Sequence, residues 1–183
     1  FLEKLIPAVE SIKVGDPLDE TTELGPLISA DHLECVDGFV QRALQNSNAS
    51  ILTGGKRLDR KGFFYAPTVI TGVAQNDEII QEEVFGPVIT VMPFKDYEEA
   101  IALGNDCNYG LSASVWTKNI DRAMRATQDL HFGAVWANTH LTVSSEVPHG
   151  GFKLSGYGND QSIYSLEEYT EIKHVMFKTS NDL

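Results

Sequence analysis

The chain has 183 residues, a formal net charge of -12 at pH 7 and 42% hydrophobic residues. This apolar content is enough for one sizeable core, so we expect a soluble globular body. The acidic balance argues against binding to nucleic acid or to an anionic membrane surface, because both require a positive field.

Cysteine content and the two ends of the sequence restrict the cellular setting. Cys35 and Cys107 are too few for a disulfide framework, and no apolar run is long enough to be a signal peptide or a membrane span. We therefore expect a cytoplasmic protein. The chain begins at Phe1, without an initiator Met and with apolar residues already at helical spacing, so we also expect it to be part of a longer polypeptide.

The first half of the chain alternates between helical and strand patterns. Residues 30–45 carry apolar side chains at the 3.6-residue period and predict an amphipathic helix that begins near Ser29 and Asp31. Two β-branched runs, at 50–53 and 65–70, lead into glycine-containing turns and predict strands.

Two helices and a strand are predicted next along the chain. Asn76 is suited to cap a short acidic helix, and the apolar run at 88–92 predicts a strand buried on both faces. Asp96 followed by Glu99 forms a capping box ahead of another helix.

The second half continues this alternation. A helical stripe over 120–130 separates strand-like runs at 111–116 and 133–138. Strand, helix, strand in this order implies parallel pairing through crossover helices, so we predict an α/β fold with a mainly parallel sheet. Ser165 and Glu168 fit one capped helical turn, and nothing in the composition marks an internal domain boundary.

The C-terminal segment has a different period. Residues 171–177 alternate between two faces, as in a strand whose edge requires a partner. Another subunit and a missing part of the same polypeptide both satisfy this requirement.

Two glycine-rich loops are candidate phosphate-binding sites. Neither residues 54–55 nor residues 150–158 have the G-x-G-x-x-G spacing, so the chain lacks a complete dinucleotide fold. The second loop suits a rigid pocket wall, although the pattern taken alone favours a structural turn.

The run QEEVFGP at 81–87 sets Glu83 and Phe85 two residues apart, and in an extended backbone their side chains share one face. A carboxylate accepts hydrogen bonds from ribose hydroxyls, and an aromatic ring packs on a flat heterocycle. The alternative is a solvated acid beside a core ring. The five histidines lack metal-ligand spacing, so we expect no zinc, and we expect both cysteines to be unreactive.

Seven short motifs, taken in order, resemble the aldehyde dehydrogenase superfamily over essentially the whole chain. They are VGDP at 14–17, LGPL at 24–27, FYAPT at 64–68, QEEVFGP at 81–87, NYGL at 108–111, GAVWAN at 133–138 and PHGGFKLSG at 148–156. Residues 136–157, with 115–118 and 174–176, look most like bacterial aminobutyraldehyde dehydrogenases. The resemblance implies the catalytic-domain fold of that superfamily with a terminal oligomerisation strand.

The resemblance implies a division of labour between this chain and an upstream part. Residues 1–160 are expected to be the C-terminal part of the catalytic domain and 161–183 a terminal oligomerisation segment, with the NAD-binding domain upstream. The nucleophilic cysteine and the glutamate that activates water also precede Phe1 in the family pattern. The chain alone is therefore expected to be inactive, because an aldehyde is oxidised through a cysteine thioester.

Several residues carry expected roles through the resemblance. Glu83 matches the acid that holds the nicotinamide ribose, and Phe85 matches the ring that confines the nicotinamide. The aldehyde tunnel is expected to be lined by His140, Leu141, Val143 and His149.

Three further residues carry weaker expectations. Glu146 is a candidate to attract a substrate ammonium group. Backbone carbonyls of Lys153 and Gly156 match a potassium site of some relatives. The implied cofactor is NAD, and NADP stays open because contacts to the adenosine 2′ position belong to the upstream domain.

The implied function is oxidation of an aminoaldehyde such as 4-aminobutanal in a homo-oligomer, a dimer or a tetramer. A betaine-aldehyde-type enzyme is an alternative within the same superfamily. Two readings from other classes are a non-catalytic assembly module that supplies a subunit interface and an unrelated α/β binding domain.

Overall fold

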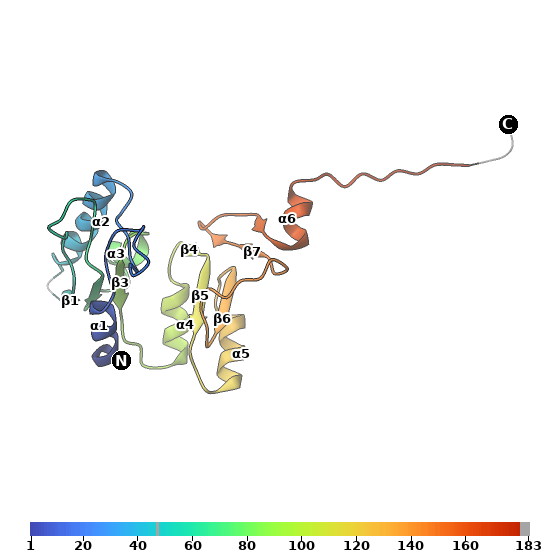
Figure 1. Ribbon diagram of the computed structural model, residues 1–183. Helices are drawn as coiled ribbons and strands as arrows, with labels where there is room; N and C mark the ends of the chain where they lie inside the picture. The colour runs from blue at the N-terminus through green and yellow to red at the C-terminus, as the bar shows by residue number, and fades with distance from the viewer. Residues whose placement is uncertain (47, 180–183) are drawn as a thin grey trace. The chain divides into compact units, whose positions relative to one another are not determined.

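The computed structural model describes residues 1–46 and 48–179 (Figure 1). The chain divides into two compact units, Phe1–Asp96 and Tyr97–Leu183. Both units combine helices with strands, so the predicted α/β class is confirmed. In the described part of the chain, no helix is long and apolar enough to cross a membrane.

The first unit is built on a three-stranded sheet. Its elements are α1 (Leu2–Glu10), α2 (Ala30–Ala43), β1 (Ser50–Thr53), β2 (Thr68–Thr71), α3 (Glu78–Gln81) and β3 (Val88–Val91). The strand order is β1-β2-β3, with β1 antiparallel to β2 and β2 parallel to β3. Helix α3 lies in the connection between the two parallel strands, as the strand–helix–strand pattern predicts.

Helix α2 supplies one side of the core, which confirms the helix predicted over 30–45. Ser29 is its N-cap, and the Ser29 hydroxyl accepts a hydrogen bond from the backbone N–H of His32. The apolar stripe then buries its side chains against the sheet and α3. The buried cluster consists of Leu33, Val36, Val40, Ala43, Tyr65, Ile70, Val73 and Ile79.

Two local expectations for this unit are wrong. Strand β3 is not buried on both faces, because Ile89 is 45% exposed. Asp77, not Asn76, is the N-cap residue of α3. The Asp77 carboxylate accepts from the Ala74 N–H in the preceding turn and makes no side-chain bond to the helix.

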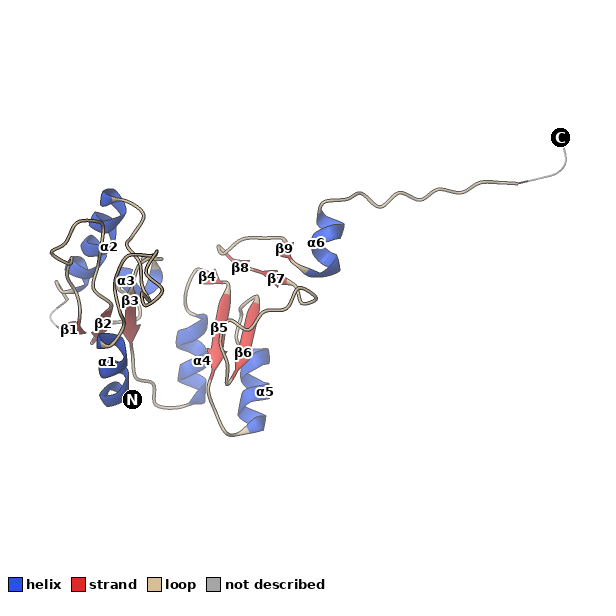
Figure 2. Ribbon diagram, in the orientation of Figure 1, coloured by secondary structure: helices blue, strands red, loops and turns tan. Residues whose placement is uncertain are grey.

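The second unit combines helices with short strands, which Figure 2 shows by colour. Its elements are α4 (Tyr97–Asn105), β4 (Tyr109–Gly110), β5 (Ser112–Val115), α5 (Ile120–Asp129), β6 (Ala134–Ala137), β7 (His149–Gly150), β8 (Phe152–Lys153), β9 (Asn159–Asp160) and α6 (Ser162–Glu168). Strands β5 and β6 pair in parallel with α5 between them, as predicted. The pairs β4/β8 and β7/β9 are antiparallel and only two residues long.

The end of this unit differs from the sequence expectation. Helix α6 begins at Ser162, three residues before the predicted start, and Glu168 accepts from the backbone N–H of Asn159 instead of taking part in a cap. Residues 171–179 form no strand and are exposed. A strand needs hydrogen-bond partners, and no described segment of this chain pairs with these residues. The predicted boundary at 160/161 and the oligomerisation role stay predictions.

Tyr65 links the core of the first unit to a charged group. Its side chain is 1% exposed, and its hydroxyl donates to Asp37 Oδ1 at 3.0 Å. Arg57 Nε lies 3.1 Å from the other oxygen of Asp37. Burial and the neighbouring carboxylate raise the pKa of Tyr65 well above its ordinary value of 10.0. The phenol therefore stays protonated where an unfolded tyrosine ionises.

Replacing Tyr65 by Phe should lower the free energy of unfolding by about 1 kcal/mol, because one buried hydrogen bond is lost. The pKa is raised in the folded state, so the tyrosine's contribution is complete below the ordinary value of 10.0 and declines as the pH rises above it. Urea unfolding of wild type, Tyr65→Phe and the exposed control Tyr169→Phe tests this. Equal stability of the two variants would contradict it.

Candidate functional site

Glu83 and Phe85 lie in the loop between α3 and β3. Both side chains are exposed, and no hydrogen bond from the described residues reaches the Glu83 carboxylate. The Phe85 ring is 74% exposed, so it is not the core ring of the alternative reading. The loop thus presents an acid and an aromatic ring two residues apart, both available to a ligand.

The backbone at Phe85 is not extended. Its φ is 53°, in the left-handed region that non-glycine residues rarely adopt. The expectation that Glu83 and Phe85 share a face of an extended segment is therefore wrong in its geometry. The Phe85 carbonyl oxygen lies 2.7 Å from His32 Nε2, which comes from the first turn of α2.

The loop that follows β6 carries three of the four predicted tunnel residues. Asn138, with φ 56°, begins it, and its side-chain amide both accepts from and donates to the backbone of Thr117, at 2.8 and 2.9 Å. The side chains of Leu141 and Val143 then lie largely in solvent, since these residues are 67% and 58% exposed. The start of the loop is thus fixed to the end of β5.

His140 is the most constrained residue of this loop. Its Nδ1 lies 2.6 Å from the hydroxyl oxygen of Ser114 on β5. Its ring meets the Trp136 indole edge-to-face, with centroids 5.4 Å apart, and the indole N–H donates to the Thr142 carbonyl at 2.8 Å. The imidazole therefore has a defined orientation although it is exposed.

His149 is placed differently from the other three tunnel residues. It begins β7 and pairs with Asp160 of β9. It lines a hollow of about 380 Å³ together with the glycine-rich loop, Glu168 and Tyr169, and His140, Leu141 and Val143 do not line that hollow. Gly156 and Gly158 have φ of 124° and 83°, so two of the four glycines of the loop adopt the positive φ expected of an irregular pocket wall.

Glu146 carries a negative charge at neutral pH. The Ser144 hydroxyl donates to its carboxylate, and this hydrogen bond is the main cause that lowers the pKa of Glu146 below its ordinary value. The same loop is joined to the start of α6, because the Ser162 N–H donates to the Ser145 carbonyl at 2.8 Å. Glu146 is exposed and has no cation partner among the described residues.

The side chain of Lys153 has a structural role that its sequence context did not indicate. Its ammonium donates to the carbonyls of Asn105 and Cys107 at 2.7 and 2.9 Å, where α4 ends. Positive charge is favourable at a helix C-terminus.

The predicted potassium site at Lys153 and Gly156 stays a prediction. Two backbone carbonyls do not complete the oxygen shell of an alkali cation. Among the described residues, no group of three His, Cys, Asp or Glu side chains forms an alternative metal site.

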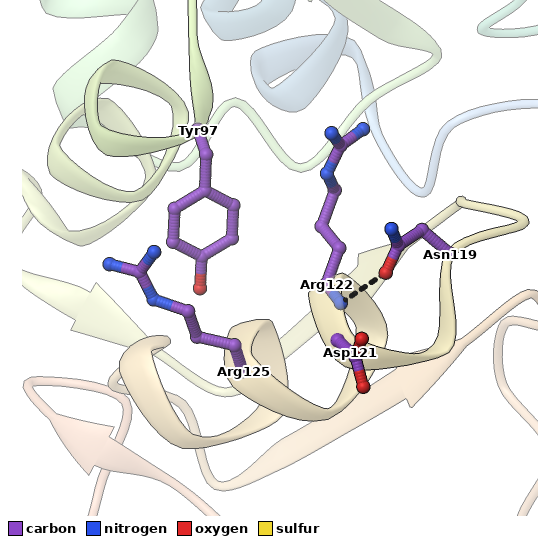
Figure 3. Close-up of a pocket in the computed structure, with 5 residues that line it drawn as sticks. All are labelled: Tyr97, Asn119, Asp121, Arg122 and Arg125. Atoms are coloured by element: carbon purple, nitrogen blue, oxygen red, sulfur yellow. Dashed lines mark hydrogen bonds between the residues drawn. The ribbon is translucent and has the colours of Figure 1, made fainter.

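A second hollow of this unit lies beside α5. Figure 3 shows Tyr97, Asn119, Asp121, Arg122 and Arg125 around it. Arg125 stacks over the Tyr97 ring at 4.3 Å and pairs with Asp129 and Glu98. The cation is thus compensated by two acids, and none of the predicted site residues lines this hollow.

Sequence reasoning missed three residues that hold the predicted ones in place: His32, Ser114 and Trp136. The sequence shows Ser114 only within a strand-like run, Trp136 only within a strand-like run and a family motif, and His32 only as one of five histidines without metal-ligand spacing. Ser114 is 26 positions from His140, and His32 is 53 positions from Phe85. No local spacing rule connects residues so far apart.

The chain is an α/β protein in which an exposed acid and an exposed aromatic ring precede a parallel strand. The chain belongs to the aldehyde dehydrogenase family, whose model matches residues 1–175. The predicted superfamily is confirmed, whereas the aminobutyraldehyde branch is not singled out.

Relatives agree with this assignment. The chain is 42% identical to a betaine aldehyde dehydrogenase of Bacillus subtilis (strain 168), over 98% of this chain and 37% of the relative. It is 39% identical to an aldehyde dehydrogenase of Emericella nidulans, over 100% and 37%. A point mutant of betaine aldehyde dehydrogenase from Staphylococcus aureus, solved in complex with NAD+, matches with a TM-score of 0.90 and 41% identity, over 99% of this chain and 38% of that one. The chain therefore spans a little over a third of the length of these relatives.

Proposed function

We propose that this chain forms the nicotinamide-confining wall and part of the aldehyde tunnel of an NAD-dependent aldehyde dehydrogenase. The carrying observation is the Glu83–Phe85 loop, which presents a carboxylate with no partner among the described residues beside an exposed ring. In this proposal, the cysteine nucleophile and the water-activating glutamate come from the upstream part of the full-length polypeptide.

The chemistry of the loop fits the nicotinamide half of the cofactor. The Glu83 carboxylate can accept hydrogen bonds from both ribose hydroxyls, and the Phe85 ring can limit the movement of a flat heterocycle. NAD+ bound there supplies the acceptor for the hydride that leaves the aldehyde carbon. The complex of the Staphylococcus aureus enzyme with NAD+ supports NAD as the cofactor. NADP stays the alternative.

The proposed substrate is a small aldehyde with a positively charged nitrogen, and we favour an aminoaldehyde such as 4-aminobutanal. Glu146 supports this class, because it is a lasting negative charge on the loop that carries His140, Leu141 and Val143. Betaine aldehyde also carries a positive nitrogen, and the relatives named for it support that alternative. A cytoplasmic location stays a prediction.

Substituting Glu83 by Gln in the full-length protein should weaken the hydrogen bonds that hold the nicotinamide ribose, because a neutral amide oxygen accepts less strongly than a carboxylate. We expect hydride transfer to slow by roughly tenfold to a hundredfold. NADH absorbance in single-turnover experiments measures the rate. The matched control is Glu82→Gln, which changes the exposed neighbouring acid. A Glu83→Gln variant that behaves like its control would exclude the proposed role.

Substituting Glu146 by Gln should raise KM for 4-aminobutanal by roughly threefold to tenfold, because an exposed charge attracts an ammonium group only through solvent. Steady-state kinetics with 4-aminobutanal, betaine aldehyde and uncharged butanal measure this. KM for butanal should not change. If the variant raises KM for all three aldehydes equally, Glu146 does not select charge.

A second candidate function is assembly of subunits through the C-terminal segment. Residues 171–177 are exposed, with Ile172 90% and Met176 81% exposed on the same face of the alternating pattern, and such apolar side chains suit an added strand.

Replacing Ile172 by Lys in the full-length protein should lower its oligomeric state, because a charge would enter an apolar interface. Size-exclusion chromatography with light scattering measures the mass, and Lys173→Gln is the control on the opposite face of the segment. An unchanged mass for Ile172→Lys would argue against this function.

A further inference from the structure

The conformation of Phe85 requires an explanation that the family assignment does not provide. A bulky aromatic residue at φ 53° is strained, and such a conformation persists only when its surroundings determine it. The side chain does not supply this constraint, because the ring is 74% exposed. The constraint must therefore act on the backbone.

His32 provides that constraint. Its Nε2 lies 2.7 Å from the Phe85 carbonyl oxygen. A carbonyl oxygen only accepts, so Nε2 carries the hydrogen of this bond. The two rings also meet edge-to-face, with centroids 6.4 Å apart and planes at 70°. One side chain thus contacts both the backbone and the ring of Phe85.

Helix α2 holds the loop at a second point one turn further on. His32 and Val36 are four residues apart and therefore share one face of the helix. Val36 is fully buried, and it packs so closely on Gly86 that a Cβ atom there would lie 2.7 Å from Val36 Cγ2. Two successive loop residues, Phe85 and Gly86, thus rest on two successive turns of α2.

His32 is itself fixed. Its backbone N–H donates to the Ser29 hydroxyl at 3.1 Å, which places it in the capped first turn of α2. The next residue, Leu33, belongs to the buried core cluster. A short series of contacts through His32 and α2 thus connects the backbone of Phe85 to the buried core of the unit.

We propose that His32 is a positioning residue that sets the direction in which Phe85 faces the nicotinamide. This inference rests on the proposed function of Phe85. Without the His32 donor, the residue can relax towards negative φ, and such a relaxation turns the ring. Cofactor affinity should change little, because Glu83 is untouched. The rate of hydride transfer should fall, because that step depends on the placement of the ring.

Four variants of the full-length enzyme test the proposal. His32→Leu removes the donor. His32→Gln and His32→Glu have the same length, and only Gln retains an N–H group. A negative residue in the first turn of α2 also favours the helix, so His32→Glu should fold. His131→Leu makes the same replacement at an exposed histidine whose ring forms no hydrogen bond among the described residues.

The expected result is a fall in the single-turnover rate of hydride transfer of roughly tenfold for His32→Leu and His32→Glu. The rate for His32→Gln should be largely restored, and His131→Leu should match wild type. The dissociation constant of NAD+, from quenching of protein fluorescence, should stay within about twofold. In a Phe85→Leu background, His32→Leu should cause little further loss, because the ring whose direction His32 sets is already absent.

Two results would overturn the inference. One is a rate within twofold of wild type for both His32→Leu and His32→Glu. The other is an equal fall in the rate of hydride transfer when His32→Leu is introduced into the wild type and into the Phe85→Leu variant. If Glu83→Gln still slows hydride transfer, only the role of His32 fails. If Glu83→Gln has no effect either, the proposed function fails with it.

Discussion

The hydrogen bond from His32 to the Phe85 carbonyl is the interaction on which the candidate cofactor wall depends. It joins a strained loop to the capped first turn of α2, and α2 is anchored by its buried stripe. A ring that is largely exposed can hold one direction only if its backbone is fixed. The functional loop therefore takes its rigidity from the core, although its own side chains contribute little to that core.

In the second unit, too, hydrogen bonds from regular elements hold an exposed loop. Its exposed loop after β6 is fixed by side chains of β5 and β6: Ser114 orients His140, and Trp136 binds the Thr142 carbonyl. Asn138 joins the start of the loop to Thr117. In each unit, a regular element supplies hydrogen-bond partners to an irregular, exposed segment. Such loops can present apolar or charged groups to a ligand without being buried themselves.

The sequence predicted the regular elements well, because their signals are local. The 3.6-residue stripe of α2 and the strand–helix–strand order around α5 are properties of short windows. Local signals failed where distant contacts decide. Phe85 is left-handed and not extended, since His32 holds its carbonyl from 53 positions away. Residues 171–177 alternate as a strand does, yet pairing requires a partner that no described segment of this chain provides.

The candidate site was predictable only in part. From residue chemistry alone, Glu83 and Phe85 could be either a cofactor-binding pair or a solvated acid beside a core ring. The family resemblance favoured the cofactor-binding pair. The grouping of His149 with His140, Leu141 and Val143 came from the resemblance, while the structure places His149 at a separate hollow with the glycine-rich loop. Glu146 illustrates the opposite case. Its charge follows from the residue type, but only the structure shows the Ser144 hydrogen bond that lowers its pKa.

The most direct test of the central claim is a crystal structure of the full-length protein with NAD+ bound. The account predicts that the Glu83 carboxylate lies within hydrogen-bond distance, about 2.6–3.0 Å, of both hydroxyls of the nicotinamide ribose. It also predicts that the Phe85 ring packs against the nicotinamide while its carbonyl remains bonded to His32. A bound cofactor whose nicotinamide ribose is held by other residues, with Glu83 and Phe85 facing solvent, would contradict it.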